Sequence, residues 1–412
     1  MNATIGTSEQ TQYFLDLEEK YGAHNYHPLP VVLQKGSGVY LWDVNGKKYY
    51  DFLSGYSAVN QGHCHSKIVD ALMQQVQTLT LTSRAFYNDQ LGEYEKFITE
   101  FFGYDKVLPV NTGVEAVETA IKLSRKWGHN VKGIAENQAK IIVCSGNFHG
   151  RTIAVISYST DPSSTKGFGP FVPGFEVIAF NDINALENAL QDKNVCAFLF
   201  EPIQGEAGVV VPDDGYYKGV RALCDEYNVL MVADEIQSGL CRTGTMLACD
   251  LENVRPDILI LGKALSGGVL PVSAVLASDE IMLTIQPGEH GSTYGGNPLA
   301  CKVAMAALSV LKEESMAANA QEMGNLFRAE LTKLKSPFIS VIRGRGLLNA
   351  IVIKHSNPDA AWELCLALME NGLLAKPTHG DKIRFAPPLL INKEQINDAV
   401  AIIQKSLAIL AG

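Results

Sequence analysis

Residues 257–268 read DILILGKALSGG, and in this segment a short apolar run is followed directly by Gly262 and Lys263. Similar apolar runs recur across residues 106–275 and alternate with amphipathic segments; examples are KVLPV, AKIIVCS, VCAFLFEP and VLMVADE. Short apolar strands that alternate with helices of about 10 to 15 residues are typical of βαβ units and of a parallel sheet buried on both faces. The sequence therefore predicts a large α/β domain with a mostly parallel sheet in the middle of the chain.

The two flanks of this region mix helices and strands. Residues 36–53, GSGVYLWDVNGKKYYDFL, predict a hairpin that turns at Asn45 and Gly46. After Pro298 a long helical stretch is followed by strand-like segments such as LLNAIVI and KIRFAPPL. We therefore expect one small α+β domain assembled from both ends of the chain. The predicted boundaries are residues 1–57 and 314–412 for the small domain and residues 58–313 for the large one.

The composition is that of a globular protein. The chain has 412 residues, of which 47% are hydrophobic and 19% charged, so it can bury a large core without disulfides. Its net charge of -10 and the lack of a basic stripe argue against a nucleic-acid partner. The eight cysteines form no CxxC pair and are expected to be reduced. Without a signal peptide, transit peptide or long apolar run, we expect no membrane partner and a cytoplasmic location, or a mitochondrial one if the natural precursor is longer.

Lys263 is the first candidate for a reactive residue. It follows a predicted strand, and ligands in open α/β sheets collect at the carboxyl ends of the strands. Desolvation in such a cleft lowers the pKa of a lysine and favours the neutral amine that Schiff-base chemistry requires. An isolated loop lysine is more commonly solvated. The interpretation of Lys263 therefore depends on the neighbouring motifs.

Two other predicted strand ends carry such motifs. Asp234 ends the run VLMVAD, where its carboxylate could keep a pyridine nitrogen protonated or could equally cap the next helix. In VNTGVEAVETA a strand passes directly into a helix, so the backbone N–H groups of Thr112, Gly113 and Val114 could bind a phosphate. A tight strand-to-helix turn requires glycine in any case, so this second motif is weak when taken alone.

In this order, a phosphate-binding turn, an aspartate strand end and a lysine strand end resemble the arrangement in fold-type I pyridoxal-phosphate enzymes. The blocks FHGRT, EPIQGE, DEIQSG and GK are similar to the signature blocks of the class III, or ω-, aminotransferases, and they lie at residues 148–152, 201–206, 234–239 and 262–263. The resemblance implies an aminotransferase with pyridoxal 5′-phosphate as its cofactor. It also implies that Lys263 binds the cofactor covalently and shuttles a proton, and that Asp234 contacts the ring nitrogen.

The same resemblance implies further cofactor contacts. Phe148 is expected to stack on the cofactor ring, and Gln237 to contact its phenolic oxygen. Ser292 and Thr293, in the segment HGSTYGGNP, are expected at the phosphate, with Thr293 reaching it from the partner subunit. A site completed across an interface implies an obligate symmetric homodimer. Phe148 and Thr293 could equally be an ordinary core residue and an ordinary turn residue.

The substrate is predicted from other parts of the chain. The strings YGAHNYHPLP and FLSGYSAVNQGHCH are similar to the ornithine δ-aminotransferase family, in which the aromatic residues matching Tyr26 and Tyr56 flank the substrate. Arg151 offers a planar guanidinium suited to the α-carboxylate, although a surface salt bridge is the alternative. The expected reaction transfers the δ-amino group of L-ornithine to 2-oxoglutarate and gives glutamate 5-semialdehyde and glutamate. His149 departs from many eukaryotic members, which carry tryptophan there; acetylornithine or another ω-amino acid is the alternative substrate.

One pocket must accept both substrates, which differ in the groups they present. The resemblance implies that Glu206 and Arg384 form a pair, in which Arg384 is masked for ornithine and released for 2-oxoglutarate. A buried ion pair costs desolvation and is only marginally stabilising, which suits it to act as a switch.

Other functional classes have weaker support. Gly62-His63-Cys64-His65 contains three potential metal ligands, but adjacent residues rarely converge on one ion and no HExxH or CxxC spacing accompanies them, so we predict no metal. Residues 343–348, RGRGLL, lack the third glycine of a dinucleotide-binding turn. A non-catalytic protein that kept this fold would be expected to have lost a reactive residue, whereas Lys263 and Asp234 are both present.

Overall fold

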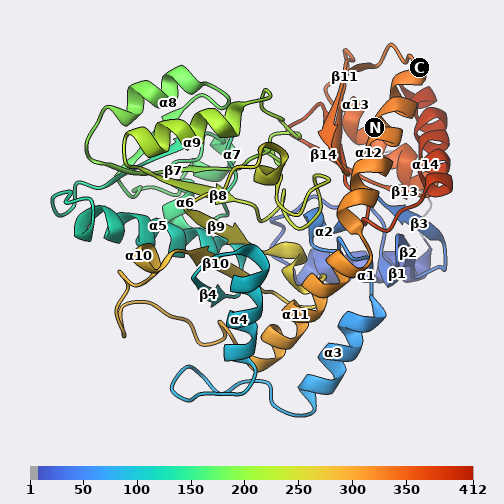
Figure 1. Ribbon diagram of the computed structural model, residues 1–412. Coiled ribbons are helices and arrows are strands. Elements are labelled where there is room, and N and C mark those ends of the chain that lie inside the picture. The colour runs from blue at the N-terminus through green and yellow to red at the C-terminus, as the bar shows by residue number, and fades with distance from the viewer. Residues whose placement is uncertain (1–7, 412) are drawn as a thin grey trace.

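A seven-stranded sheet lies at the centre of the computed structural model, which describes residues 8–411 (Figure 1). Its strand order is β4-β10-β9-β8-β7-β5-β6. Strands β5 to β9 pair in parallel, whereas β10 runs antiparallel to both β4 and β9. The strands are β4 (Lys106–Val110), β5 (Lys140–Cys144), β6 (Phe175–Ile178), β7 (Val195–Phe200), β8 (Leu230–Asp234), β9 (Ile258–Leu261) and β10 (Ser273–Ala277). The mostly parallel α/β sheet predicted from the sequence is confirmed.

Helices cover both faces of this sheet, and successive strand residues point to opposite faces. Ile141 and Val143 of β5 pack in the cluster that includes α5 (Gly113–Asn130), whereas Ile142 packs with α8 (Ile183–Leu190) and α9 (Tyr216–Glu226). Burial on both faces explains why the strands are apolar without alternation. Short elements complete this part of the chain: α6 (Ile153–Ile156), α7 (Pro162–Thr165), η1 (Ala248–Glu252), η2 (Lys263–Ser266) and α10 (Asp279–Met282).

A second sheet combines strands from the two ends of the chain. Its order is β1-β2-β3-β13, and β2 and β3 form the predicted hairpin, with Gly46 in the turn at a φ of 83°. The Asp43 carboxylate closes the turn by accepting hydrogen bonds from the backbone N–H groups of Asn45 and Lys47, both at 2.9 Å. The strands are β1 (Leu33–Ser37), β2 (Tyr40–Asp43), β3 (Lys48–Asp51) and β13 (Leu373–Leu374).

A third sheet, of order β11-β12-β15-β14, lies among the C-terminal helices (Figure 1). Its strands are β11 (Ile339–Arg345), β12 (Leu348–Ile353), β14 (Lys376–Thr378) and β15 (Lys382–Phe385). The helices of this region are α12 (Met316–Lys333), α13 (Ala360–Glu370), α14 (Lys393–Ser406) and η3 (Leu407–Ala411). The parallel pairing of β13 with β3 joins both ends of the chain, as the sequence led us to expect, while the exact domain boundaries stay a prediction.

The remaining helices connect these regions. The long helix α11 (Pro298–Glu313) begins at the proline noted in the sequence and packs against α3 and α4. The other helices in the N-terminal part of the chain are α1 (Glu9–Tyr21), α2 (Ser54–Ser57), α3 (Ser66–Val76) and α4 (Leu91–Phe102). Within residues 8–411, no helix has the length and apolar character needed to cross a membrane.

Candidate active site

The carboxyl ends of β8 and β9 and the N-terminus of α5 meet at a cavity of about 150 Å³. Six predicted cofactor residues line it: Gly113, Val114, Phe148, Asp234, Gln237 and Lys263. A neighbouring cavity of about 310 Å³ shares Phe148 and His149 and extends to Glu206. The topology therefore brings together residues that are far apart in the sequence.

Lys263 lies immediately after β9 and starts η2 with a φ of 46°, a left-handed conformation that is uncommon for residues other than glycine. A Cβ at the preceding Gly262 would lie 2.7 Å from the Ser273 hydroxyl and 3.3 Å from the Ile236 side chain, so a larger residue there would have to displace these side chains. The pKa of Lys263 is lowered, chiefly because burial disfavours the ammonium ion; Arg384 adds to this effect, while Glu206 and Asp234 oppose it. Lowering this pKa makes the neutral, nucleophilic amine more accessible.

Asp234 contacts His149 inside the protein. Oδ2 of Asp234 lies 2.7 Å from Nδ1 of His149, and Oδ1 accepts a hydrogen bond from the backbone N–H of Ile236. Burial lowers the pKa of His149, but the hydrogen bond and charge of Asp234, with the charge of Glu201, outweigh burial and raise it. Sequence analysis treated His149 only as a departure from a family pattern and did not predict this contact.

Glu201 is a second buried acid that sequence analysis did not single out. Its carboxylate accepts a hydrogen bond of 2.9 Å from the backbone N–H of Phe148. Burial raises the pKa of Glu201 to about 7; the charge of His149 lowers it, and that of Asp234 raises it. Glu201 thus holds the backbone of Phe148, the predicted ring-stacking residue.

The start of α5 has the form expected of an anion site. As the first residues of the helix, Gly113 and Val114 have no intrahelical partner for their N–H groups, and both line the cavity. Thr112 precedes them, and its N–H group, unlike theirs, has a partner among the described residues of the chain. Its N–H donates to Glu115, whose own N–H is capped by the Thr112 hydroxyl, and Thr112 is exposed rather than part of the cavity wall. Its predicted role in binding phosphate stays untested.

Ser292 contacts Asn111, which directly follows β4, but neither Ser292 nor Thr293 lines the cavity of its own chain. The Ser292 hydroxyl accepts hydrogen bonds from the backbone N–H of Gly295 at 2.8 Å and from Nδ2 of Asn111 at 3.4 Å. Thr293 is exposed. Within one chain the structure therefore leaves Thr293 available to another molecule.

A polar network at the other side of the cavity joins Glu206, Gln237 and Arg384. Arg384, on β15, donates from one terminal nitrogen to Oε1 of Glu206 at 2.7 Å and to Oε1 of Gln237 at 3.2 Å. Gln237 in turn donates to Oε1 of Glu206 at 3.1 Å. A Cβ on Gly205 would lie 1.7 Å from Oε1 of Gln237, so only glycine permits this approach. The predicted Glu206–Arg384 contact is confirmed.

Charge explains why the network holds Glu206 ionised. Burial raises the pKa of Glu206, but the charges of Arg384 and Lys263 and the hydrogen bonds from Arg384 and Gln237 outweigh burial, so its pKa is lowered. The guanidinium of Arg384 also lies over the ring of Tyr56, 4.9 Å from its centroid. A cation at this distance from an aromatic face is favourable.

The other four predicted substrate residues all influence the pKa of Tyr56. The pKa of Tyr56 is raised, chiefly by burial and then by the charge of Glu206, while Arg384 lowers it; Tyr26 and Arg151 contribute smaller effects of opposite sign. Arg151 is exposed, and its guanidinium lies 5.5 Å from the centroid of the Phe148 ring. Among the described residues, Arg151 forms no salt bridge. Tyr26 is 69% exposed and lines a separate surface cavity near α1.

The histidines of the GHCH segment do not converge. Nε2 of His63 lies 2.7 Å from Oδ2 of Asp51, whereas Nε2 of His65 lies 3.1 Å from Oε1 of Glu314. Cys64, between them, is exposed. In the part of the chain that the structure describes, no group of three or more His, Cys, Asp or Glu residues is arranged to hold a metal ion.

Comparison with known proteins identifies the family. The model of the family described as Aminotransferase class-III matches residues 21–407. The chain belongs to the class III aminotransferases. This class III aminotransferase is 64% identical to a protein of Drosophila melanogaster named "Ornithine aminotransferase, mitochondrial", over 98% of this chain and 93% of that protein.

Two solved structures show how closely the fold is shared. The ornithine aminotransferase of Toxoplasma gondii, whose structure is described as having partial occupancy of PLP at the active site, matches with a TM-score of 0.96 and 50% identity, over 97% of this chain and 95% of that one. A structure named acetylornithine aminotransferase, from Elizabethkingia anophelis, matches with a TM-score of 0.89 and 59% identity, over 97% of this chain and 99% of that one. The class III aminotransferase is therefore similar to proteins named for both candidate substrates.

Proposed function

We propose that this class III aminotransferase transfers the δ-amino group of L-ornithine to 2-oxoglutarate, with pyridoxal 5′-phosphate as its cofactor. The observation that carries the proposal is the network of Glu206, Gln237 and Arg384 beside Tyr56 and Lys263. It supplies the arginine that a dicarboxylate needs and the acid that masks it. The names of the relatives in Drosophila melanogaster and Toxoplasma gondii support ornithine as the donor.

The residues at the cavity fit this cofactor. A lysine amine with a lowered pKa, a buried carboxylate, an aromatic ring and two N–H groups at a helix start match an aldehyde, a pyridine nitrogen, a ring face and a phosphate. When bound, pyridoxal phosphate supplies the electron sink that makes the proton on the substrate carbon acidic. Phe148 would limit the position of the ring, Gln237 would contact its oxygen substituent, and Asp234, held by His149, would present a carboxylate to its nitrogen.

Lys263 is the group that moves the proton. It lines the cavity together with Asp234 and Phe148, and its lowered pKa favours the neutral form that would accept a proton from Cδ of ornithine. Arg151, free of a carboxylate partner among the described residues, is suited to hold the α-carboxylate of the substrate by two parallel hydrogen bonds. Tyr56 and Tyr26 would then enclose its aliphatic chain.

The Glu206–Arg384 pair lets one pocket accept both substrates. With ornithine, Arg384 stays bound to Glu206 and presents no unpaired cation to the ammonium end of the substrate. With 2-oxoglutarate, a substrate carboxylate takes the place of Glu206 at the guanidinium. Because one carboxylate replaces another at the guanidinium, Arg384 is not left as an unpaired buried charge, which would be strongly destabilising.

We also propose a homodimer in which each chain contributes Thr293, with Ser292 beside it, to the phosphate site of its partner. The exposure of Thr293 and the contact of the adjacent Ser292 with Asn111, just before α5, support this arrangement. The cytoplasmic location expected from the sequence stays a prediction, because the Drosophila melanogaster relative is named mitochondrial.

Steady-state kinetics with three amino donors would test the proposed substrate. L-Ornithine, N-acetylornithine and 4-aminobutyrate are supplied in turn with 2-oxoglutarate, and kcat/KM is compared. We expect L-ornithine to have the highest kcat/KM, since its free α-amino group and carboxylate match the polar surroundings of Tyr56 and Arg151. A higher value for N-acetylornithine would instead assign the acetylornithine activity suggested by the relative from Elizabethkingia anophelis.

Replacing Tyr56 with isoleucine is expected to reduce the preference for ornithine. The substitution removes the aromatic face that lies against the Arg384 guanidinium and the hydroxyl whose pKa the charge of Glu206 raises. Losing one such contact, worth about 1–2 kcal/mol, lowers the ratio of kcat/KM for ornithine over N-acetylornithine by roughly 5- to 30-fold. Tyr13→Ile, at an exposed tyrosine of α1, is the matched control. An unchanged ratio in the Tyr56 variant would remove this residue from substrate selection.

A further inference from the structure

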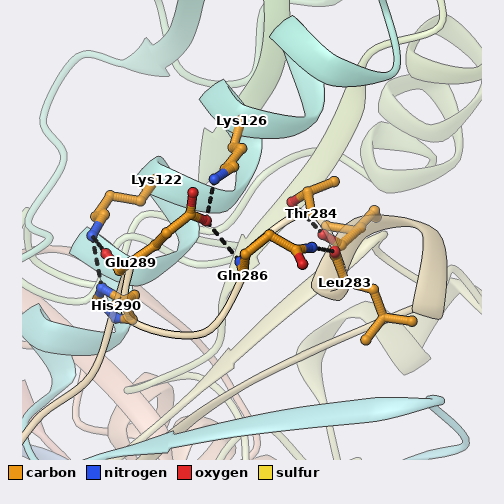
Figure 2. Close-up of polar contacts among 8 residues, drawn as sticks. Lys122, Lys126, Leu283, Thr284, Gln286, Glu289 and His290 are labelled. Carbon is orange, nitrogen blue, oxygen red and sulfur yellow. Dashed lines mark hydrogen bonds and ion pairs between the residues drawn. The ribbon is translucent and has the colours of Figure 1, made fainter.

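The segment of residues 283–293, which leads from α10 to Ser292 and Thr293, is fastened to one face of α5 (Figure 2). Lys122 donates from Nζ to the backbone oxygen of Glu289 at 3.1 Å and to Nδ1 of His290 at 2.9 Å. Lys126 forms an ion pair with the Glu289 carboxylate. Nε2 of His290 lies 2.9 Å from the hydroxyl of Thr119. Positions 119, 122 and 126 recur every three or four residues and therefore lie on the same side of the helix.

The segment is also held internally before it reaches α5 (Figure 2). The Glu289 carboxylate accepts a hydrogen bond from the backbone N–H of Gln286 at 2.7 Å, and the Gln286 amide donates to the backbone oxygen of Leu283 at 2.8 Å. The buried Thr284 hydroxyl donates to the backbone oxygen of Ile281 at 2.7 Å. These bonds shape the segment into a defined turn.

Hydrogen-bond directions fix the protonation state and tautomer of His290. The Thr119 hydroxyl donates its proton to the backbone oxygen of Glu115 at 2.7 Å, so toward His290 it acts as an acceptor. Nε2 of His290 is then the protonated nitrogen, and Nδ1 accepts from the Lys122 ammonium. Both ring nitrogens are satisfied only in this neutral form. Consistently, burial and then the charge of Lys122 lower the pKa of His290, while Glu115 opposes them.

The helix to which this segment is fastened is the one whose first residues, Gly113 and Val114, line the candidate cofactor cavity. Just before α5, Asn111 also contacts Ser292, so contacts hold the segment both at the start of this helix and along its side. We propose that His290, supported by Glu289, is a positioning residue that holds Thr293 where it meets the cofactor phosphate of the partner subunit. The inference rests on the proposed function, because it assumes that Thr293 serves that phosphate.

Cofactor binding with and without the phosphate provides the test. The apo dimer is titrated with pyridoxal 5′-phosphate and with pyridoxal, each followed by absorbance, and the ratio of the two dissociation constants is compared between variants. His290→Phe keeps a ring but removes both hydrogen bonds, and Thr119→Val keeps the shape of the side chain but removes the hydroxyl. We expect roughly 10-fold weaker binding of pyridoxal 5′-phosphate in His290→Phe, the effect of losing two ordinary hydrogen bonds, with pyridoxal binding unchanged.

A histidine at the other end of α5 is the matched control. Nδ1 of His129 contacts the backbone oxygen of Ile134 at 2.9 Å, so His129→Phe removes a similar bond from the last turn of the same helix, and that bond does not involve residues 283–293. His129→Phe should leave the ratio of the two dissociation constants unchanged.

If His290→Phe fails to fold, the isosteric Thr119→Val is expected to lower the phosphate preference by a smaller factor. An unchanged ratio in Thr119→Val overturns the inference.

Thr293→Ala separates this inference from the proposed function. If Thr293→Ala leaves the phosphate preference unchanged, the cross-subunit site of the proposed function is wrong. If Thr293→Ala lowers the preference but His290→Phe does not, only the positioning role is wrong. If both single variants lower the phosphate preference, the double variant is expected to lower it no further than Thr293→Ala alone, because His290 acts through Thr293. Equal weakening of pyridoxal and pyridoxal 5′-phosphate in His290→Phe would show a general structural defect and overturn the proposal.

Discussion

Replacing Lys263 with alanine is expected to lower kcat for ornithine by roughly 10⁴-fold, since the variant loses its only proposed proton carrier. Borohydride reduction followed by peptide mass spectrometry should attach the cofactor to the peptide containing Lys263 in the unaltered protein and to no peptide in Lys263→Ala. The lowered pKa of Lys263 and its place in the cavity are the physical basis of both expectations.

Lys333→Ala is the control for this experiment, because Lys333 lies on the surface of α12 and pairs only with Glu330 among the described residues. It should retain full activity and normal labelling. Chemical rescue adds a second check: a small primary amine supplied in solution should restore part of the turnover in Lys263→Ala. Full turnover of Lys263→Ala without added amine would contradict the assignment.

Replacing Asp234 with asparagine is expected to lower kcat by about 10- to 1000-fold. The substitution keeps the size of the side chain and removes the negative charge, and an opposite charge at hydrogen-bond distance commonly shifts a neighbouring pKa by about 1–3 units. A pyridine nitrogen beside an asparagine would hold its proton less well, so the cofactor would draw electrons less effectively.

The same variant has a readout that needs no cofactor. The Asp234 carboxylate raises the pKa of His149 against the effect of burial, so the imidazole of His149 in Asp234→Asn should titrate at lower pH by NMR in the apo protein. Asp192→Asn, which removes a carboxylate paired with Lys140 away from the cavity, should leave the His149 titration and kcat unchanged. If His149 titrates identically with and without the Asp234 carboxylate, the proposed coupling is wrong.

Much of the fold could be predicted because its strands are short, apolar and buried on both faces. The runs at β4, β5, β7, β8 and β9 and the turn at Gly46 are local patterns, and the structure confirms them. The order of the strands is not local. Nothing in the run SAVLA of β10 shows that it lies antiparallel between β4 and β9, because periodicity reports burial and not the neighbouring strand.

The candidate site was predictable where one residue follows one strand. Lys263 and Asp234 each end an apolar run, so their positions at the same edge of the sheet follow from topology. The contact of His149 with Asp234 and the burial of Glu201 depend on folding of distant segments, and no spacing in the sequence indicates them. The backbone N–H of Thr112 is bound to Glu115, a local capping arrangement that the motif TGVE contains but that the expectation of a phosphate contact overlooked.

On the ribosome, β1, β2 and β3 are made long before the strand that completes their sheet. Tyr50 and Phe52 donate their N–H groups to Gly372 and Leu374, at 2.8 and 2.9 Å, so β3 remains an open edge until the chain is almost fully synthesised. An unpaired strand edge can join other chains, and pairing across so long a separation is slow. We therefore expect completion of the N-terminal sheet by β13 to be a late step in folding, and truncation before residue 373 to promote aggregation.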